Sequence, residues 1–349
     1  MGRRAIDARG LAVILGLTLA VDLVIRPFSQ RNGIRAQVFA PAALLDGLAV
    51  LALTAPLLRA LTPAVRARMG AVWTRGARCA PFLLLFAFAA GGAAVRAEQF
   101  LRYVSDAPLP RVAVYALVLA AAFYAMRCGA ETLARVCGVL AWLFGLSVVI
   151  LLASNAGGMA IVNLETEVFD LAEWALTAAR GFSLPAQIAL FFWLALSARD
   201  DLRRPYRRTL LAVILLAMVL SVAAELVLGS QAQMQNQTVH ALSRLGGISV
   251  FHRLDALHTA AWLAAIFAKA CAFALAARMA AEGLLPREKR AQASGWALAA
   301  LLVGVLAATA VSDRWQSRIE SAACAALLLA LGAGAFAAGR AYEKTKGAS

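Results

Sequence analysis

The sequence contains few of the residue types that build disulfide frameworks and metal centres. It has five cysteines and three histidines in 349 residues. The cysteines form no C-x-x-C pair and fall in or beside apolar runs, which favours small buried hydrophobes over a disulfide framework. The histidines show no metal-binding spacing beside a nearby pair of carboxylates. We therefore predict neither a metal site nor a cofactor.

Familiar short catalytic motifs are absent as well. No G-x-S-x-G, H-E-x-x-H or P-loop pattern occurs, so we do not predict an enzyme. Acidic residues are scarce, 19 against 34 lysines and arginines, and the formal net charge is +15. Such a charge would suggest nucleic-acid binding in a soluble protein. Here the arginines lie between apolar runs, so we interpret them as topology signals and predict no nucleic-acid partner.

Apolar residues, by contrast, are abundant. Hydrophobic residues make up 62% of the chain, and the mean hydropathy is +0.75. This composition predicts an all-α, multi-pass cell-membrane protein with one polytopic domain over residues 1–349. The charged start followed by an apolar run resembles a signal peptide, but we interpret it as the first membrane helix. At roughly 20 residues per crossing, we predict about ten spans, near 9–27, 37–60, 79–104, 110–127, 133–154, 170–198, 207–229, 253–279, 292–311 and 320–340.

Basic residues between the spans predict the orientation. Most lysines and arginines fall on the side of the N-terminus, for example in the runs within 199–208 and 287–290. Cytoplasmic loops carry such an excess, so we predict that both termini are cytoplasmic. The longest outer connection, Gly229–His252, is either a short re-entrant or interfacial helix acting as a lid or a solvated loop.

The eighth predicted span carries charge inside an apolar run. The stretch Phe251–Met279 contains Asp255, His258 and Lys269. At 100° per residue, Asp255, Trp262 and Lys269 share one stripe of a helix, with Lys269 roughly 21 Å deeper than Asp255. An ionisable group at that depth indicates a ligand or transport pathway, unless it is structurally paired or its side chain extends to the interface.

Two predicted spans contain residues that interrupt helices. In VDLVIRPF, Asp22 precedes Arg26 and Pro27, and in AARGFSLPAQ, Gly181 and Pro185 lie mid-span. The backbone groups freed by such breaks are tolerated in a membrane only where they line a cavity or are buried in protein. Paired broken helices are therefore a sign of a transporter binding site.

Three stretches resemble a known family. They are YAMRCGAETLARVCGVL (Tyr124–Leu140), HRLDALHTAAWLAAIFAKACAFALAA (His252–Ala277) and EQFLRYVSDAPLP (Glu98–Pro110). With the number of spans and the long outer loop, they are similar to the spore germination permeases. These are the B-type subunits of nutrient germinant receptors, within the amino acid–polyamine–organocation superfamily.

The resemblance implies a fold and a role. It implies a LeuT-type fold, with two inverted five-helix repeats and a midplane pocket between spans one, three, six and eight. It also implies sensing of a small nutrient, typically an amino acid, in the inner membrane of spores, together with an A-type membrane subunit and a C-type lipoprotein. Two other functions stay open: a proton-coupled amino-acid transporter, and a membrane scaffold subunit that binds no ligand.

An amino-acid ligand needs an acid or carbonyls for its ammonium and helix amides or an arginine for its carboxylate. The candidate ligand contacts are Asp22, Glu98, Arg180, Gly181, Phe182, Ser183 and Trp262. The charged candidates have alternative ion-pair partners, in the pairs Asp22–Arg26, Glu98–Arg102 and Arg180–Glu173.

Lys269 and Asp255 are candidates for a conformational role rather than a ligand contact. The ammonium group of Lys269 could stand where a sodium-coupled relative holds its cation, bracing spans one and eight together. Asp46 and Glu225 are isolated acids within apolar runs, and either could relay protons or neutralise Lys269. The sequence alone assigns no pair.

Overall fold

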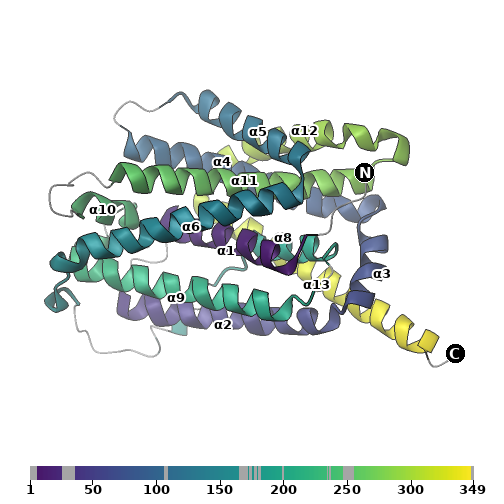
Figure 1. The fold of residues 1–349 in the computed structure, drawn as a ribbon, viewed down its shortest axis with the longest axis horizontal. Coiled ribbons are helices and arrows are strands. Elements are labelled where there is room, and N and C mark those ends of the chain that lie inside the picture. The colour runs from purple at the N-terminus through teal and green to yellow at the C-terminus, as the bar shows by residue number, and fades with distance from the viewer. Residues whose placement is uncertain are drawn as a thin grey trace.

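Helices make up almost all of the computed structural model. We describe residues 6–25, 36–105, 109–164, 172, 175–176, 179, 182–198, 200–233, 235, 237–246 and 255–346. Within this part of the chain there are twelve α-helices and no strand. They form an elongated bundle in which most long helices run along its length (Figure 1).

Eight helices in the described residues are long and apolar enough to cross a membrane. Their outward faces carry large apolar side chains such as Leu84, Trp142 and Leu329, which a soluble protein would bury. The prediction of an all-α membrane protein is therefore confirmed. These helices are α2 (Ala36–Ala60), α4 (Ala80–Val104), α5 (Arg111–Cys128), α6 (Ala130–Asn155), α9 (Arg203–Leu228), α11 (Asp255–Leu284), α12 (Ala293–Thr309) and α13 (Asp313–Lys346).

Two further apolar helices lie inside the bundle. The first, α1 (Ala8–Ile25), has 18 residues and occupies the first predicted span. The second, α8 (Ala186–Ala195), has only ten residues, and all ten are buried. It covers the end of the sixth predicted span, which is interrupted, since residues 182–185 are not helical. The interruption falls at Pro185, which lacks the N–H that a helix interior needs.

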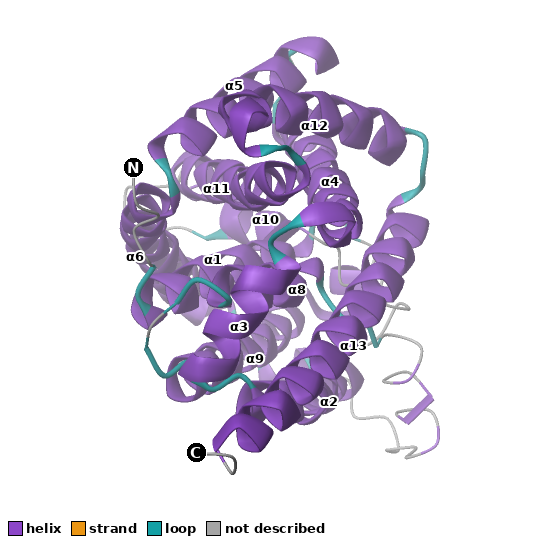
Figure 2. Ribbon diagram, turned by 90° about the vertical axis from the view of Figure 1, so that its right-hand side faces the viewer, coloured by secondary structure: helices purple, strands orange, loops and turns teal. Residues whose placement is uncertain are grey.

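The centre of the bundle is formed by α1, α4, α8 and α11. In α4 and α11, 67% and 72% of an apolar stretch of 18 residues is buried within the protein. The corresponding share is 22–44% in the other six membrane-length helices of the described part. Viewed along the bundle, these central helices are surrounded by α2, α5, α6, α9, α12 and α13 (Figure 2). Alanines and glycines allow this close packing: Gly91 of α4 meets Gly304 of α12 with no space for a Cβ on either residue.

Short helices lie at the two ends of the bundle. At one end, Arg66 of α3 (Pro63–Trp73) donates a hydrogen bond of 2.7 Å to the Asp200 carbonyl oxygen. The Asp200 carboxylate accepts one of 3.2 Å from the N–H of Ala8, at the start of α1. At the other end, α10 (Thr238–Leu245) buries five of its eight residues. The long connection before α11 therefore contains a packed helix.

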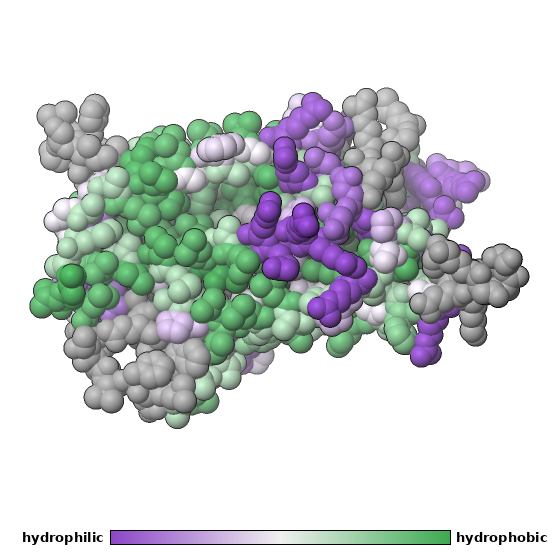
Figure 3. Space-filling view, turned by 60° about the horizontal axis from the view of Figure 1, so that its bottom comes forward, coloured by the Kyte–Doolittle hydropathy of each residue, from purple (hydrophilic) through white to green (hydrophobic). Residues whose placement is uncertain are grey.

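Polar residues gather at the α3 end. Figure 3 shows hydrophilic side chains towards one end of the visible face and hydrophobic ones over most of the rest. The same end holds the start of α1 and the end of α13 (Figure 1). The 3₁₀ turns between helices are η2 (Gly76–Cys79), η3 (Ala156–Gly158), η4 (Ile161–Asn163), η5 (Gly229–Gln233) and η6 (Arg287–Gln292).

Candidate functional site

A buried cluster of polar side chains joins three of the central helices. Lys269 of α11 and Asp22 of α1 form an ion pair through Oδ1 of the carboxylate. The other carboxylate oxygen, Oδ2, accepts a hydrogen bond of 2.7 Å from Nε2 of Gln187 on α8. The same amide nitrogen donates to the backbone carbonyl of Thr18 at 3.1 Å. One carboxylate thus connects α1, α8 and α11.

The depth of this cluster makes its pairing essential. Lys269 is the middle residue of the thirty-residue helix α11 and is 1% exposed, while Asp22 is 7% exposed. An isolated charge at such a position would be strongly unfavourable, whereas a hydrogen-bonded pair compensates much of the lost hydration. Lys269 thus has Asp22 as an ion-pair partner, a pair that the sequence alone did not assign.

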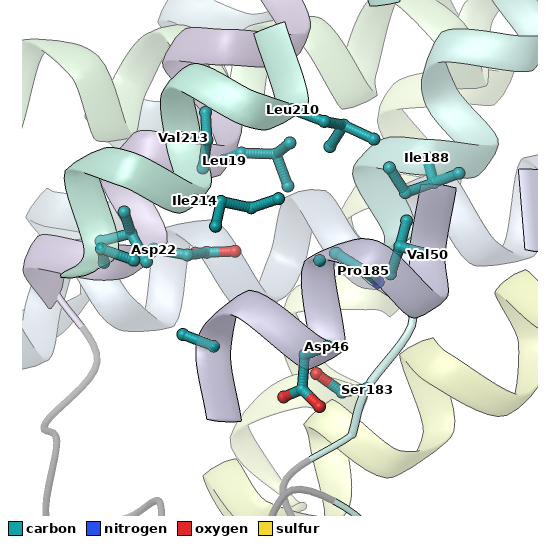
Figure 4. A pocket seen from close by; sticks show the side chains of 14 residues that line it. Leu19, Asp22, Asp46, Val50, Ser183, Pro185, Ile188, Leu210, Val213 and Ile214 are labelled. Atoms are coloured by element: carbon teal, nitrogen blue, oxygen red, sulfur yellow. The ribbon is translucent and has the colours of Figure 1, made fainter. Parts of the chain in front are cut away.

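A cavity of about 130 Å³ lies on another side of Asp22 (Figure 4). Among the described residues its walls are mostly aliphatic, with Asp22, Asp46 and Ser183 as the polar side chains. In Figure 4 the side chains of Asp46 and Ser183 point towards one another. The described residues that line it are Leu19, Asp22, Leu23, Ala43, Asp46, Gly47, Val50, Ser183, Pro185, Ile188, Leu210, Val213, Ile214 and Ala217.

The position of this cavity differs from the one implied by the resemblance. Its described lining comes from α1, α2, α8 with the segment leading into it, and α9, which belong to spans one, two, six and seven. Spans three and eight, α4 and α11, contribute none of its lining. Direct packing explains this, since Phe86 of α4 and Phe273 of α11 fill the space between them, with ring centroids 6.3 Å apart. Both the expected pocket and the observed cavity are lined by spans one and six.

Ser183 reaches the cavity from the non-helical segment before α8. Two backbone groups of this segment are hydrogen-bonded by α13. The N–H of Leu184 donates to Oγ of Ser321 at 2.8 Å. The carbonyl of Pro185 accepts from Sγ of Cys324 at 3.3 Å. Irregular backbone is tolerated in a membrane protein when it is paired in this way. The break thus exposes Ser183 to the cavity while its neighbours stay hydrogen-bonded.

Trp262 lies in a separate cluster, towards the α10 end. Its Nε1 donates a hydrogen bond of 3.2 Å to Oγ of Ser147 on α6. The His258 ring stacks on it at 5.6 Å between centroids, and Phe100 of α4 lies at 6.3 Å. Trp262 therefore ties α11 to α4 and α6, and it does not line the cavity.

Glu98 also lies away from the cavity. Although it is buried, its carboxylate pairs with Arg102 on the same helix and with Arg111 at the start of α5, the latter at 3.1 Å. The alternative pairing of Glu98 with Arg102 is therefore present. Asp255 is the first residue of α11, two turns from Trp262 and four from Lys269.

The remaining sequence candidates belong to the sixth span. Phe182 is 37% exposed and does not line the cavity. Arg180 and Gly181 lie outside the described residues, as do Arg26 and Glu173, the alternative partners of Asp22 and Arg180. Of the seven predicted ligand contacts, the structure thus brings Asp22 and Ser183 together at one cavity.

A second buried ion pair was not predicted. Arg96 of α4 pairs with Glu320 of α13 at 3.3 Å, and Gln316 donates to the same carboxylate oxygen at 3.1 Å. An arginine within an apolar run is a sequence signal for a buried partner. Glu320 lies 224 positions later, and only the packing of α4 against α13 brings the two side chains together.

The three stretches that resemble a known family all fall within residues 79–314, which match the family described as spore germination protein. The chain belongs to this family. No curated protein matches it. This spore germination protein is therefore a permease-like, multi-pass membrane protein. The matched region includes α4 to α12, with Ser183 and Lys269, while Asp22 precedes it.

Proposed function

We propose that this protein is the B-type subunit of a nutrient germinant receptor. In this proposal it senses a small nutrient of the amino-acid class in the cavity beside Asp22. It transmits binding to an A-type membrane subunit and a C-type lipoprotein. The proposal extends the family membership from germination in general to ligand sensing.

The observation that carries the proposal is the position of Asp22. Its carboxylate lines a mostly apolar cavity and also links the central helices α1, α8 and α11. A ligand that contacts this carboxylate would act directly on the link between helices. Ligand binding can shift a conformational equilibrium only through such differential contacts.

The helix arrangement supports the implied LeuT-type fold. In such a fold, α1, α2, α4, α5 and α6 would form one repeat, and the second would run from the interrupted sixth span to α13. The first span of each repeat contributes to the cavity, through Asp22 of α1 and Ser183 of the segment before α8. The third helices, α4 and α11, are the most buried of the membrane-length helices described. Both features are expected of a transporter-derived binding site.

A ligand screen with a blocked cavity tests the proposal. The purified full-length protein is heated with common amino acids, nucleosides and sugars, alongside the variant Ala217→Leu, which fills the cavity. Ala212→Leu, at an exposed position of the same helix, is the matched control. A nutrient at a hundredfold excess over its dissociation constant should stabilise the wild type and the control by about 2.7 kcal/mol. The blocked variant should show no shift.

Further measurements separate the sensor from the two alternative functions. Uptake of a labelled amino acid into vesicles, abolished by a proton uncoupler, would identify a transporter. If no nutrient binds and the protein is still needed to assemble the complex, it is a scaffold. The sensor is supported if binding occurs without uptake and Ala217→Leu abolishes nutrient-triggered germination of spores that still assemble the complex.

The proposed location is the inner spore membrane, with both termini in the cytoplasm. The start of α1 and the end of α13 lie at the α3 end (Figure 1), and α3 itself carries Arg66 and Arg68. Cytoplasmic segments of membrane proteins are enriched in such basic residues. Epitope tags placed at either terminus should be protected from protease in right-side-out vesicles and cleaved after permeabilisation. Cleavage of one tag before permeabilisation would contradict this topology.

A further inference from the structure

We propose that α9, at its end beside α3, binds an anionic phospholipid from the adjacent membrane leaflet. The guanidinium groups of an arginine cluster bind the phosphate of the lipid, and exposed leucines further along α9 contact its acyl chains. This inference goes beyond the proposed function and does not depend on nutrient sensing. The arginine cluster consists of Arg59 of α2 and Arg203, Arg204, Arg207 and Arg208 of α9.

Four members of the cluster share one side of α9. At 100° per residue, the four arginines of α9 fall within an arc of roughly 140°. All four side chains are exposed. Tyr206 lies between them in the sequence but points the other way and is fully buried. The first turns of α9 therefore present their basic side outward, away from the bundle.

Arg59 adds a fifth guanidinium group from the end of α2. Its side chain is exposed, and its backbone carbonyl accepts a hydrogen bond of 3.2 Å from Nη2 of Arg203. The end of α2 and the start of α9 are thus joined. The hydrogen bond from Arg66 of α3 to the Asp200 carbonyl, just before α9, places this junction at the α3 end of the bundle.

The charge of the cluster is not neutralised by ion pairs. Among the described residues, none of the five arginines forms one. The acids just before α9, Asp200 and Asp201, accept hydrogen bonds from the backbone N–H groups of Ala8 at 3.2 Å and Arg203 at 3.1 Å. Neighbouring like charges repel one another, and an anion between them offsets this repulsion. Phosphate suits arginine because the planar guanidinium donates two parallel hydrogen bonds to it.

The surface of α9 changes from charged to apolar directly after the cluster. Leu211 and Leu215 lie on the same side of the helix as Arg204 and Arg208, and they are 44% and 61% exposed. Leu211 follows Arg208 by three residues, or roughly 4.5 Å along the helix. Figure 3 brings forward the face at the bottom of Figure 1, where α2 and α9 run, and shows a hydrophilic patch beside a larger apolar surface. A phospholipid has the same order of groups, a charged headgroup followed by acyl chains.

The position of these arginines distinguishes them from ordinary topology signals. Topology requires only an excess of basic residues in cytoplasmic loops, such as the run within residues 287–290. The arginines of α9 belong to a membrane helix itself and continue into its lipid-facing surface. Clusters of about four to eight basic residues at the cytoplasmic end of a membrane helix favour anionic lipids, and each residue contributes about a fivefold factor in affinity.

Native mass spectrometry of the purified full-length protein in a neutral detergent tests the proposal, with phosphatidylglycerol as the probe. The variant Arg204→Gln/Arg207→Gln/Arg208→Gln removes three exposed charges. It keeps Arg203, which bonds to the end of α2. Its affinity for phosphatidylglycerol should fall at least about tenfold, because three phosphate donors are lost.

The matched control is Arg287→Gln/Lys289→Gln/Arg290→Gln. It removes the same charge from exposed positions of η6. Its affinity for phosphatidylglycerol should change less than about twofold, because these residues lie outside the cluster. An equal loss of affinity in both triple variants would reveal a general attraction to positive charge and would overturn the inference.

A charge-conserving variant separates lipid recognition from a folding defect. Arg204→Lys/Arg207→Lys/Arg208→Lys keeps the charge but loses the two-pronged hydrogen bonds. It should bind phosphatidylglycerol about threefold more weakly than the wild type, and more tightly than the glutamine variant. A lysine variant as weak as the glutamine variant would contradict recognition by charge.

Two further probes identify the source of the phosphate. Phosphatidylcholine, whose headgroup has no net charge, should bind the wild type at least about tenfold more weakly than phosphatidylglycerol. Inorganic phosphate at the same concentration should not displace phosphatidylglycerol, because it lacks the acyl chains that contact the leucines. Displacement by inorganic phosphate would show a site for a free anion rather than a lipid, and equal binding of both lipids would show that the headgroup charge is not recognised.

Discussion

Lys269 on α11 donates a hydrogen bond to the carboxylate of Asp22 on α1, 247 positions earlier in the chain. Both side chains are almost fully buried. Loss of one partner from such a pair leaves an uncompensated charge, which is more damaging than loss of the pair as a whole.

Asp22→Asn/Lys269→Met should therefore be more stable than Lys269→Met alone. We expect Lys269→Met to destabilise the protein by about 3–5 kcal/mol, and the double variant to recover most of this loss. Thermal unfolding in one detergent, at constant ligand concentration, measures both. Equal stability of the single and double variants would show that the buried Asp22 carboxylate does not need Lys269 to compensate its charge.

A second prediction concerns the close contact of α4 with α12. A Cβ on Gly91 would lie 2.4 Å from backbone atoms of Gly304, and one on Gly304 would lie 2.2 Å from the Ala87 carbonyl oxygen. Backbone atoms cannot move aside as a flexible side chain can, so Gly304→Ala should force the two helices apart. We expect the free energy of unfolding to fall by about 1–3 kcal/mol or more. Thermal unfolding provides the measurement.

Gly295 is the matched control for this prediction. It lies on the same helix, and a Cβ there would meet nothing within 4 Å. Gly295→Ala should be neutral or stabilising by up to about 1 kcal/mol, because alanine favours a helix more than glycine does. If both alanine variants are tolerated equally, α4 and α12 do not pack as described.

A third prediction concerns the hydrogen bond between Trp262 and Ser147. Trp262→Phe removes the donor, while Ser147 keeps its own hydrogen bond to the Phe144 carbonyl at 2.9 Å, so the loss should be about 0.5–1.5 kcal/mol. Ser147→Ala leaves a buried indole N–H without this acceptor and should lose about 1–3 kcal/mol. Unfolding of the two single variants and the double variant measures the coupling. Strictly additive losses would argue against the bond.

A fourth prediction is a pH dependence at α10. Burial, and next the positive charge of Arg244, lower the pKa of His240, which also faces Asp255 and His258 of α11 and Tyr103 of α4. The unfolded chain therefore takes up the proton first as the pH falls through the ordinary value of 6.5. The contribution of His240 to the free energy of unfolding is therefore fully present above that pH, and it is lost as the pH falls below it.

The variant His240→Gln should reduce this pH dependence. One histidine can contribute a slope of at most about 1.4 kcal/mol per pH unit. Unfolding curves of wild type and variant, recorded between about pH 7.5 and about pH 5.5, should therefore diverge at low pH, with the wild type losing more stability. Parallel curves would assign the acid sensitivity to other groups.

Much of the architecture was predictable from local sequence. Long apolar runs and their flanking charges predicted the membrane helices, because a helix that crosses lipid must satisfy its backbone internally. The interruption before α8 was predictable from Pro185, and the unusual position of Lys269 from its depth in an apolar run. The motif around Asp255, Trp262 and Lys269 also indicates the family from the sequence alone.

Partners and cavities were decided by the tertiary structure. The sequence suggested Asp22 as a ligand contact or a partner of Arg26, and Asp46 and Glu225 as acids that could neutralise Lys269. Only the packing of α1 against α11 shows that Asp22 pairs with Lys269. Trp262 shares a stripe with Lys269 but contacts α6 rather than the cavity, because the neighbours of a helix change along its length. Composition thus determined that this chain enters the membrane as helices. Long-range packing determined which charges meet there and where a ligand has room, because both depend on contacts between residues far apart in the chain.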